Sequence, residues 1–225
     1  MQHVVIGAGE VGQAIFNVLS EKHDVYMRDI EPDGPQRADV LHVCFPYSYN
    51  FNEAVYDYVK EYQAKLWIIH STVPRGTSAK LSAVHSPVRG RHPALTESVR
   101  TFVKFFGGPR AAEAAAYFSE CGVPVKVVAD SDATEAGKMW ELAQYGLAIA
   151  IEKSIYAYCE DNRLDFDTVY TLFAETYNEG YTALNEPQFV RPVLRHMPGP
   201  IGGHCVVPGS LMLNHPLASL VVEAR

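Results

Sequence analysis

The pattern of apolar and polar positions changes character near residue 130. Before that point, short apolar runs alternate with amphipathic segments. Strands are predicted over residues 4–6, 24–27, 40–45, 65–70, 83–86, 101–106 and 123–128, and helices over residues 11–20, 53–62 and 110–121. Strands that alternate with helices at this spacing indicate βαβ units and a parallel sheet. We therefore predict an α/β domain over residues 1–129 and a helical region over residues 130–225.

The predicted helical region is dominated by one long helix. Ser131 or Asp132 can cap its N-terminus, and no proline follows until well beyond residue 160. The long helix is predicted over residues 131–160, and a second helix over residues 167–177. The tail from Glu186 is rich in proline, glycine and histidine, which predicts loops with short helical turns.

Composition and charge narrow the class of protein. The 225 residues are 48% hydrophobic and 20% charged, which is typical of a soluble folded protein. The net charge of −7 gives no electrostatic support for a nucleic acid or an acidic membrane as a partner. The four cysteines form no CxxC pair, as expected of free thiols in a reducing compartment. Because the sequence shows no signal peptide and no membrane-spanning stretch, we expect a cytoplasmic protein.

The first predicted strand leads into a glycine-rich turn, GAGEVG. Gly7, Gly9 and Gly12 match the GxGxxG pattern, with Glu10 and Val11 inside it. The first glycine permits the tight turn, the second lets the backbone approach a pyrophosphate, and the third lets the helix pack on the strand. Backbone N–H groups at the helix N-terminus then bind the phosphates. The turn predicts a Rossmann-type sheet and a dinucleotide site formed by these five residues.

The end of the second strand contains the residues that choose between NAD and NADP. Asp29 follows Gly12 by 17 residues, and its carboxylate can accept hydrogen bonds from a ribose hydroxyl. The same charge would repel the 2′-phosphate of NADP, so the predicted cofactor is NAD. Arg28, beside it, weakens this preference and is included among the predicted cofactor-binding residues. Pro46, after the third strand, and Ser71, after the fourth, complete that set.

Three later segments resemble one known family. Residues 71–77 are STVPRGT, and residues 199–208 are GPIGGHCVVP. They resemble the STVPxGT turn and the GxGGHCxP loop of the UDP-glucose/GDP-mannose dehydrogenases, most closely those of the N-acetylated amino-sugar branch. Between them, residues 135–139, EAGKM, resemble the start of that family's long central helix. These segments and the glycine turn occur in the family's order over about residues 3–210.

The resemblance implies a particular chemistry. Enzymes of that family oxidise the C6 alcohol of a nucleotide sugar twice, with two NAD, and pass through a cysteine thioester. The resemblance implies that Cys205 is the nucleophile and that Lys138 stabilises the oxyanion. It places Thr72 near the nicotinamide and the active-site water. The expected substrate is therefore a small anionic molecule, with a nucleotide sugar as the candidate.

The chain also departs from that family. The family has an active-site asparagine where this chain has Leu142, and an aspartate where it has Gly209. Where the family has SPE after the fifth strand, this chain has SPV, with Val88 in place of the carboxylate. The family continues into a second Rossmann-like domain, and this chain ends at Arg225. These differences leave the expected NAD half intact and put the substrate half in doubt.

Two alternatives to a nucleotide-sugar dehydrogenase stay open. One is a catalytically silent NAD-binding protein with a regulatory or structural role. In that protein Cys205 is a buried loop cysteine, and Lys138 is a solvated lysine on a helix. The other is a dehydrogenase of the 6-phosphogluconate or prephenate type that acts on a small anion. No metal is predicted, because Cys205 with His196, His204 and His215 matches no common zinc-ligand spacing.

The long helix also predicts the oligomeric state. Its apolar residues, among them Ile149, Ile151 and Ile155, point in several directions and need cover on more than one face. The resembled family forms its dimer on the corresponding helix. We therefore expect a homodimer.

Overall fold

A computed structural model describes residues 1–30, 34–203 and 205–224. The chain divides into two compact units, an N-terminal unit, Met1–Lys138, and a C-terminal unit, Met139–Arg225. Helix α6, Ser131–Asn162, begins in the N-terminal unit and continues in the C-terminal unit. The predicted boundary between the two regions, between residues 129 and 130, lies just before this helix begins.

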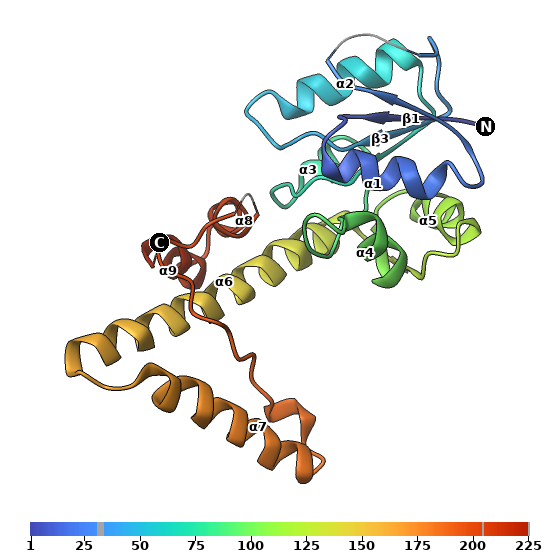
Figure 1. The fold of residues 1–225 in the computed structure, drawn as a ribbon. Coiled ribbons are helices and arrows are strands. Elements are labelled where there is room, and N and C mark those ends of the chain that lie inside the picture. The colour runs from blue at the N-terminus through green and yellow to red at the C-terminus, as the bar shows by residue number, and fades with distance from the viewer. Residues whose placement is uncertain (31–33, 204, 225) are drawn as a thin grey trace. The chain divides into compact units, whose positions relative to one another are not determined.

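The N-terminal unit is built on a single sheet (Figure 1). Within the described residues the sheet has seven strands in the order β2-β1-β3-β4-β5-β6-β7. The strands are β1 (Gln2–Ile6), β2 (Asp24–Arg28), β3 (Val40–Val43), β4 (Leu66–Ile69), β5 (Val84–His85), β6 (Lys104–Gly107) and β7 (Val125–Val128). Neighbouring strands are parallel except β5 and β6, which are antiparallel. The predicted α/β fold, a Rossmann-type parallel sheet followed by a helical region with one long helix, is confirmed, and the antiparallel pairing of β5 with β6 is the one departure from the predicted strand directions among the described residues.

Helices cover both faces of this sheet (Figure 1). One face packs against α1 (Glu10–Leu19), α4 (Leu95–Thr101) and α5 (Ala111–Glu120). The other packs against α2 (Phe51–Tyr62) and against Leu81, which directly follows α3 (Thr77–Lys80). Successive side chains of a strand point to opposite faces, so Val5 joins the first core while Val4 and Ile6 join the second. Because both faces are covered there, the central strands β3 and β4 are almost wholly buried, whereas the edge strands β2 and β7 are partly exposed.

The predicted elements differ most from the structure between β4 and β6. The sequence predicts a strand over residues 101–106, whereas α4 continues to Thr101 and β6 begins at Lys104. Neither α3 nor α4 is expected from the sequence. These helices have four and seven residues, which is too short to establish a clear apolar period.

A row of buried histidines crosses the apolar core beneath α5. His3 Nδ1 lies 3.0 Å from His42 Nε2, and His42 Nδ1 lies 3.1 Å from His70 Nε2. The Ser86 carbonyl oxygen accepts from His70 Nδ1 and from Lys104 Nζ, each at 2.8 Å. Since a carbonyl only accepts, the network assigns the hydrogen to Nδ1 of all three rings. His3 Nε2 is then an acceptor with no hydrogen-bond partner among the described residues.

The C-terminal unit is helical and has a small core. Besides α6 it contains the π-type turn η1 (Asp167–Leu172), α7 (Phe173–Ala183), the 3-10 turn η2 (Pro187–Phe189), α8 (Val206–Leu213) and α9 (Pro216–Glu223). The buried residues of its core cluster are Ala150, Ile201 and Val221. No residue of η1 or α7, all of which are described, is buried. The predicted loop-rich tail thus contains two helices of eight residues each.

In the part of the chain that the structure describes, no helix combines the length and the apolar character needed to span a membrane.

Candidate functional site

The glycine turn joins β1 to α1 at the carboxyl edge of the sheet. Gly7 has a φ of +101°, a backbone conformation that favours glycine. A Cβ on Gly12 would lie 1.8 Å from the Gly7 carbonyl oxygen, so only glycine fits there. A Cβ on Gly9 would meet no atom within 4 Å. The turn is therefore closely packed at its two ends and open at Gly9, which is where a pyrophosphate needs to approach.

The N-terminus of α1 faces this opening with backbone groups. Gly9 is the N-cap residue and has no side chain to cap the helix. The first N–H groups of a helix lack partners within it, and the helix dipole favours an anion at that end. The Glu10 carboxylate pairs with His92, and the Val11 side chain packs against the core. Glu10 and Val11 thus offer the cofactor their backbone, and the turn fits the pyrophosphate of a dinucleotide.

The two residues at the end of β2 that are expected to bind the cofactor have different surroundings. Arg28 is only 8% exposed, and its guanidinium pairs with Glu61, donates to Tyr62 Oη at 3.0 Å and lies over the Tyr58 ring. Arg28 therefore attaches β2 to α2. Asp29, which follows, is exposed. At this edge the carboxylate rather than the guanidinium is available to a ligand.

The predicted residues after β3 and β4 lie beside the glycine turn. A Cβ on Gly7 would lie 3.1 Å from the backbone nitrogen of Phe45, so the end of β3 passes close to the turn. Pro46 follows and is exposed. The buried Ser71 hydroxyl donates to the Phe45 carbonyl at 2.6 Å, and the next residue, Thr72, is half-buried. The fold thus brings Gly7, Pro46, Ser71 and Thr72 to one edge of the sheet.

The first turn of α6 holds the segment that follows Thr72. Glu135 is fully buried, and its carboxylate accepts from the Gly76 N–H at 2.6 Å and from the Ser78 N–H at 2.7 Å. Burial raises the pKa of Glu135, while the two N–H groups favour its charged form. In the sequence, Glu135 stands out only as a part of the EAGKM segment. A bond to backbone groups far away in the chain leaves no pattern in the sequence.

His85, on β5, connects the same two segments. Its Nε2 lies 3.2 Å from the Ser71 carbonyl oxygen, and its Nδ1 lies 2.7 Å from Thr134 Oγ1. Burial lowers the pKa of His85 to about 3, and the positive charges of Lys104 and Lys138 act in the same direction. Lys138 is half-buried and acts on His85 at this edge. Sequence reasoning places His85 in a strand but assigns it no role.

The predicted nucleophile lies in the other unit. Cys205 is half-buried and is the N-cap residue of α8, in the C-terminal unit, whereas Lys138 belongs to the N-terminal unit. The roles that the resemblance implies for Cys205 and Lys138 in one active site stay predictions. His204 lies outside the described residues. Among the residues that are described, no group of three or more His, Cys, Asp or Glu side chains could hold a metal ion.

Two positions at which the chain departs from the resembled family touch each other. Gly209, on α8, is buried, and a Cβ there would lie 2.6 Å from Leu142 Cδ1, on α6. Glycine at this position therefore leaves the room that the Leu142 side chain occupies. An apolar contact thus occupies the two positions at which the resembled family has an asparagine and an aspartate.

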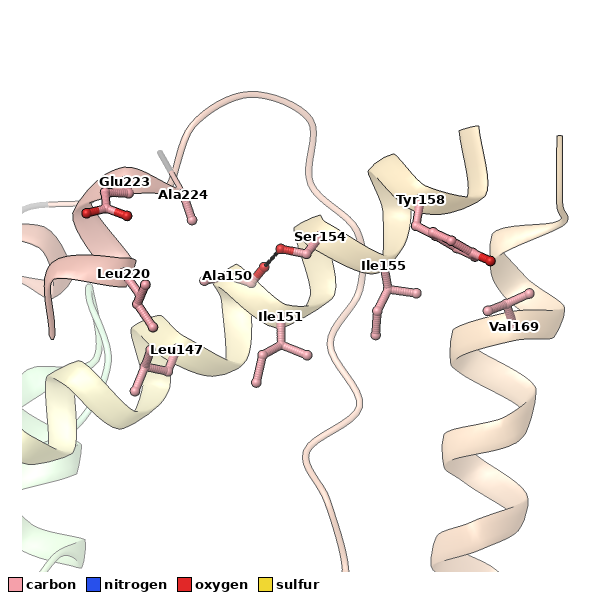
Figure 2. Close-up of a pocket in the computed structure, with 10 residues that line it drawn as sticks. All are labelled: Leu147, Ala150, Ile151, Ser154, Ile155, Tyr158, Val169, Leu220, Glu223 and Ala224. Carbon is pink, nitrogen blue, oxygen red and sulfur yellow. Dashed lines mark hydrogen bonds between the residues drawn. The ribbon is translucent and has the colours of Figure 1, made fainter. Parts of the chain in front are cut away.

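Apolar grooves run along α6 within the C-terminal unit. One groove has a volume of about 680 Å³. Figure 2 shows its lining, which includes Leu147, Ile151 and Ile155 of α6, with Leu220 of α9 toward one end and Val169 of η1 toward the other. A second groove, of about 760 Å³, shares these α6 residues and extends along α7. The apolar side chains of α6 are thus open to solvent on more than one side.

No family model and no curated protein matches the chain. Solved structures do match in fold. A UDP-D-ManNAc dehydrogenase from Pyrococcus horikoshii matches with a TM-score of 0.80 and 17% identity, over 100% of this chain and 68% of its own length. A UDP-N-acetyl-mannosamine dehydrogenase from Staphylococcus aureus matches with a TM-score of 0.74 and 16% identity, over 100% of this chain and 67% of its own length. A 3-hydroxyisobutyrate dehydrogenase from Mycobacterium tuberculosis matches with a TM-score of 0.69 and 14% identity, over 99% of this chain and 91% of its own length.

At these identities the likeness concerns the fold. The chain has the fold of these dehydrogenases and spans about two thirds of the length of the two nucleotide-sugar enzymes. The resemblance inferred from the sequence motifs is confirmed at this level.

Proposed function

We propose that the chain is an NAD-dependent oxidoreductase of the nucleotide-sugar dehydrogenase type. The observation that carries the proposal is the glycine turn, which is closed at Gly7 and Gly12 and open at Gly9. A turn of this shape before a helix N-terminus binds the pyrophosphate of a dinucleotide. NAD, when bound, supplies the hydride acceptor for oxidation of an alcohol.

The chain's own residues have distinct roles in this proposal. Asp29 accepts hydrogen bonds from the ribose hydroxyls, and its charge disfavours a 2′-phosphate. Thr72 contributes to the edge of the site nearest the nicotinamide. Lys138 supplies positive charge for an oxygen that becomes negative during the reaction. Cys205 is the nucleophile that bonds to an aldehyde carbon, because a thiolate is strongly nucleophilic.

Calorimetry with NAD and NADP tests the cofactor proposal. We expect NAD to bind more tightly than NADP. The absence of binding to either dinucleotide would contradict the site, and tighter binding of NADP would contradict the role of Asp29. Formation of NADH with a panel of UDP-sugars and GDP-sugars then tests the substrate class.

Alkylation with iodoacetamide tests the role of Cys205. Cys44, Cys121 and Cys159 are buried, and burial raises the pKa of Cys44 to about 12, so these three thiols serve as internal controls. We expect selective labelling of Cys205 that is suppressed by NAD, measured by peptide mass. Equal labelling of all four thiols would remove the nucleophile from the proposal.

The second candidate is an NAD-binding protein without catalysis. The contact between Leu142 and Gly209 favours it, because an apolar contact occupies two positions that are polar in the resembled family. This candidate predicts NAD binding without NADH formation for any sugar nucleotide, and no protection of Cys205 by NAD. The proposed oxidoreductase predicts the opposite in both assays.

A further inference from the structure

We infer that His85, Thr134 and Glu135 are positioning residues that fix the segment containing Thr72 relative to Lys138, and so shape the nicotinamide end of the cofactor site. The inference rests on the proposed NAD-binding function. All five residues belong to the N-terminal unit. The segment between β4 and α3 has two buried attachments to the first turn of α6, and these three side chains form them. An exposed ion pair of Arg75 with Asp132 joins the same two segments at the surface.

The first attachment is made by Glu135. One carboxylate oxygen accepts from the Gly76 N–H at 2.6 Å and the other from the Ser78 N–H at 2.7 Å. Both donors are backbone groups, so the bonds fix the course of the chain itself. Gly76 precedes α3 and provides no side-chain cap, so the Glu135 carboxylate supplies partners that the start of α3 lacks.

The second attachment is a directed chain of hydrogen bonds from Thr134 through His85 to Ser71. The Ser71 carbonyl oxygen can only accept, so His85 Nε2 carries the ring hydrogen. Nδ1 of the neutral ring then accepts from the Thr134 hydroxyl, 2.7 Å away. That hydroxyl also lies 2.9 Å from the Ser131 carbonyl, but its single hydrogen is needed by the imidazole, because His85 is buried and neutral.

The two attachments meet on one side of α6. Lys138 follows Thr134 by four residues and Glu135 by three, a spacing that places side chains on the same face of a helix. The segment is held at Ser71 on one side of Thr72 and at the start of α3 on the other. The side chains of α6 that fix the segment around Thr72 are therefore one helical turn away from Lys138, on the same face of the helix. Loosening either attachment moves Thr72 relative to Lys138.

The test compares two ligands on the full chain. ADP-ribose contains the adenosine and the pyrophosphate of NADH but lacks the nicotinamide, so the ratio of the two affinities isolates the nicotinamide end. Thr134→Val removes the hydroxyl at nearly constant volume. We expect it to weaken NADH binding about tenfold and to change ADP-ribose binding less than about twofold. Thr134→Ser keeps the hydroxyl and is expected to bind both ligands as the wild type does.

Glu135→Gln tests the first attachment with a second measurement. It keeps one acceptor oxygen and loses the other, so we expect exchange of the Gly76 and Ser78 amide hydrogens to accelerate about tenfold. We also expect its ratio of NADH to ADP-ribose affinity to fall. An unchanged ratio in both Thr134→Val and Glu135→Gln, or an equal loss for both ligands, overturns the inference alone. A wild-type protein that binds neither ligand overturns the proposed function and this inference with it.

Discussion

The two units of this protein use their apolar residues differently. In the N-terminal unit both faces of the sheet are covered, and side chains as large as Phe106 and Phe118 are fully buried. In the C-terminal unit the buried cluster is small, while Ile151 is 59% and Phe173 is 69% exposed. The comparison shows that a sheet covered on both faces supplies its own core, whereas a long helix with apolar residues on several sides needs cover from elsewhere.

The same difference extends to the candidate site. The N-terminal unit contains the glycine turn, whose own geometry requires Gly7 and Gly12, and a network that attaches Thr72 to α6. The C-terminal unit contains the predicted nucleophile Cys205, but also the apolar contact of Leu142 with Gly209. The proposed cofactor half of the site thus rests on contacts within one unit, whereas the proposed catalytic half involves residues of both units.

The largest expected effect comes from substitutions in the glycine turn, where one glycine is needed for folding and another only for binding. Gly12→Ala places a Cβ 1.8 Å from the Gly7 carbonyl oxygen, so we expect it to lower the free energy of unfolding by at least about 3 kcal/mol and to abolish NAD binding. Gly9→Ala is the matched control for stability, because its Cβ meets nothing and its φ of −67° suits alanine. We expect Gly9→Ala to unfold like the wild type but to lose NAD affinity at least tenfold, ~1.4 kcal/mol. Denaturant titration and calorimetry measure both, and normal NAD binding by Gly9→Ala would contradict the site.

The next effect concerns the buried histidines of the N-terminal unit. Burial lowers the pKa of His3 from 6.5 to about 4, and it also lowers the pKa of His42 and His70. As the pH is lowered, these three histidines therefore bind protons at a higher pH in the unfolded chain than in the folded protein. Their contribution to the free energy of unfolding is fully present above pH 6.5 and is lost as the pH is lowered toward 4. For His3 alone, the free energy of unfolding falls by about 3 kcal/mol over this range.

His3→Gln tests this account. Glutamine retains an N–H donor for His42 but does not titrate, so we expect the loss of stability between pH 6.5 and 4 to shrink by about 3 kcal/mol. Acid unfolding curves of equal steepness for His3→Gln and the wild type would exclude His3 as a source of the pH dependence.

The third effect concerns the exposed face of the C-terminal unit. We propose that a second copy of the chain covers α6 and α7. Ile151→Glu and Phe173→Glu place a charge in the apolar groove, and we expect each to weaken dimerisation about a hundredfold, ~2.7 kcal/mol, without loss of NAD binding. Tyr49→Glu, at an exposed position of the N-terminal unit, should leave the dimer intact. Sedimentation of the wild type as a 24.9 kDa monomer at micromolar concentration would refute the proposal.

The smallest expected effect is on cofactor choice. Asp29→Ala removes the exposed carboxylate at the end of β2, while Arg28 stays engaged with Glu61 and Tyr62. We expect NAD binding to weaken about tenfold, ~1.4 kcal/mol, and NADP binding to change little, so that the preference narrows. Calorimetry with both dinucleotides measures it. Equal weakening of both would show that Asp29 acts on the fold rather than on the ribose.

The sequence by itself determined the elements whose residues are neighbours along the chain. Apolar runs predict β1 to β5 and β7, and the glycine spacing predicts the turn between β1 and α1. The absence of proline predicts α6 almost to its observed end at Asn162. These predictions succeed because the physical causes, strand and helix periodicity and the steric freedom of glycine, act over a few residues.

Only the tertiary structure decided which distant groups meet. The antiparallel pairing of β6 depends on the order of strands in the sheet, and no local pattern encodes that order. The attachments of Glu135 to Gly76 and of His85 to Thr134 join residues 59 and 49 positions apart. A buried polar side chain must find a partner, but its identity depends on which segments the fold places beside it. For the same reason, the contact between Leu142 and Gly209 shows that two separate departures in the sequence are one packing feature of the structure.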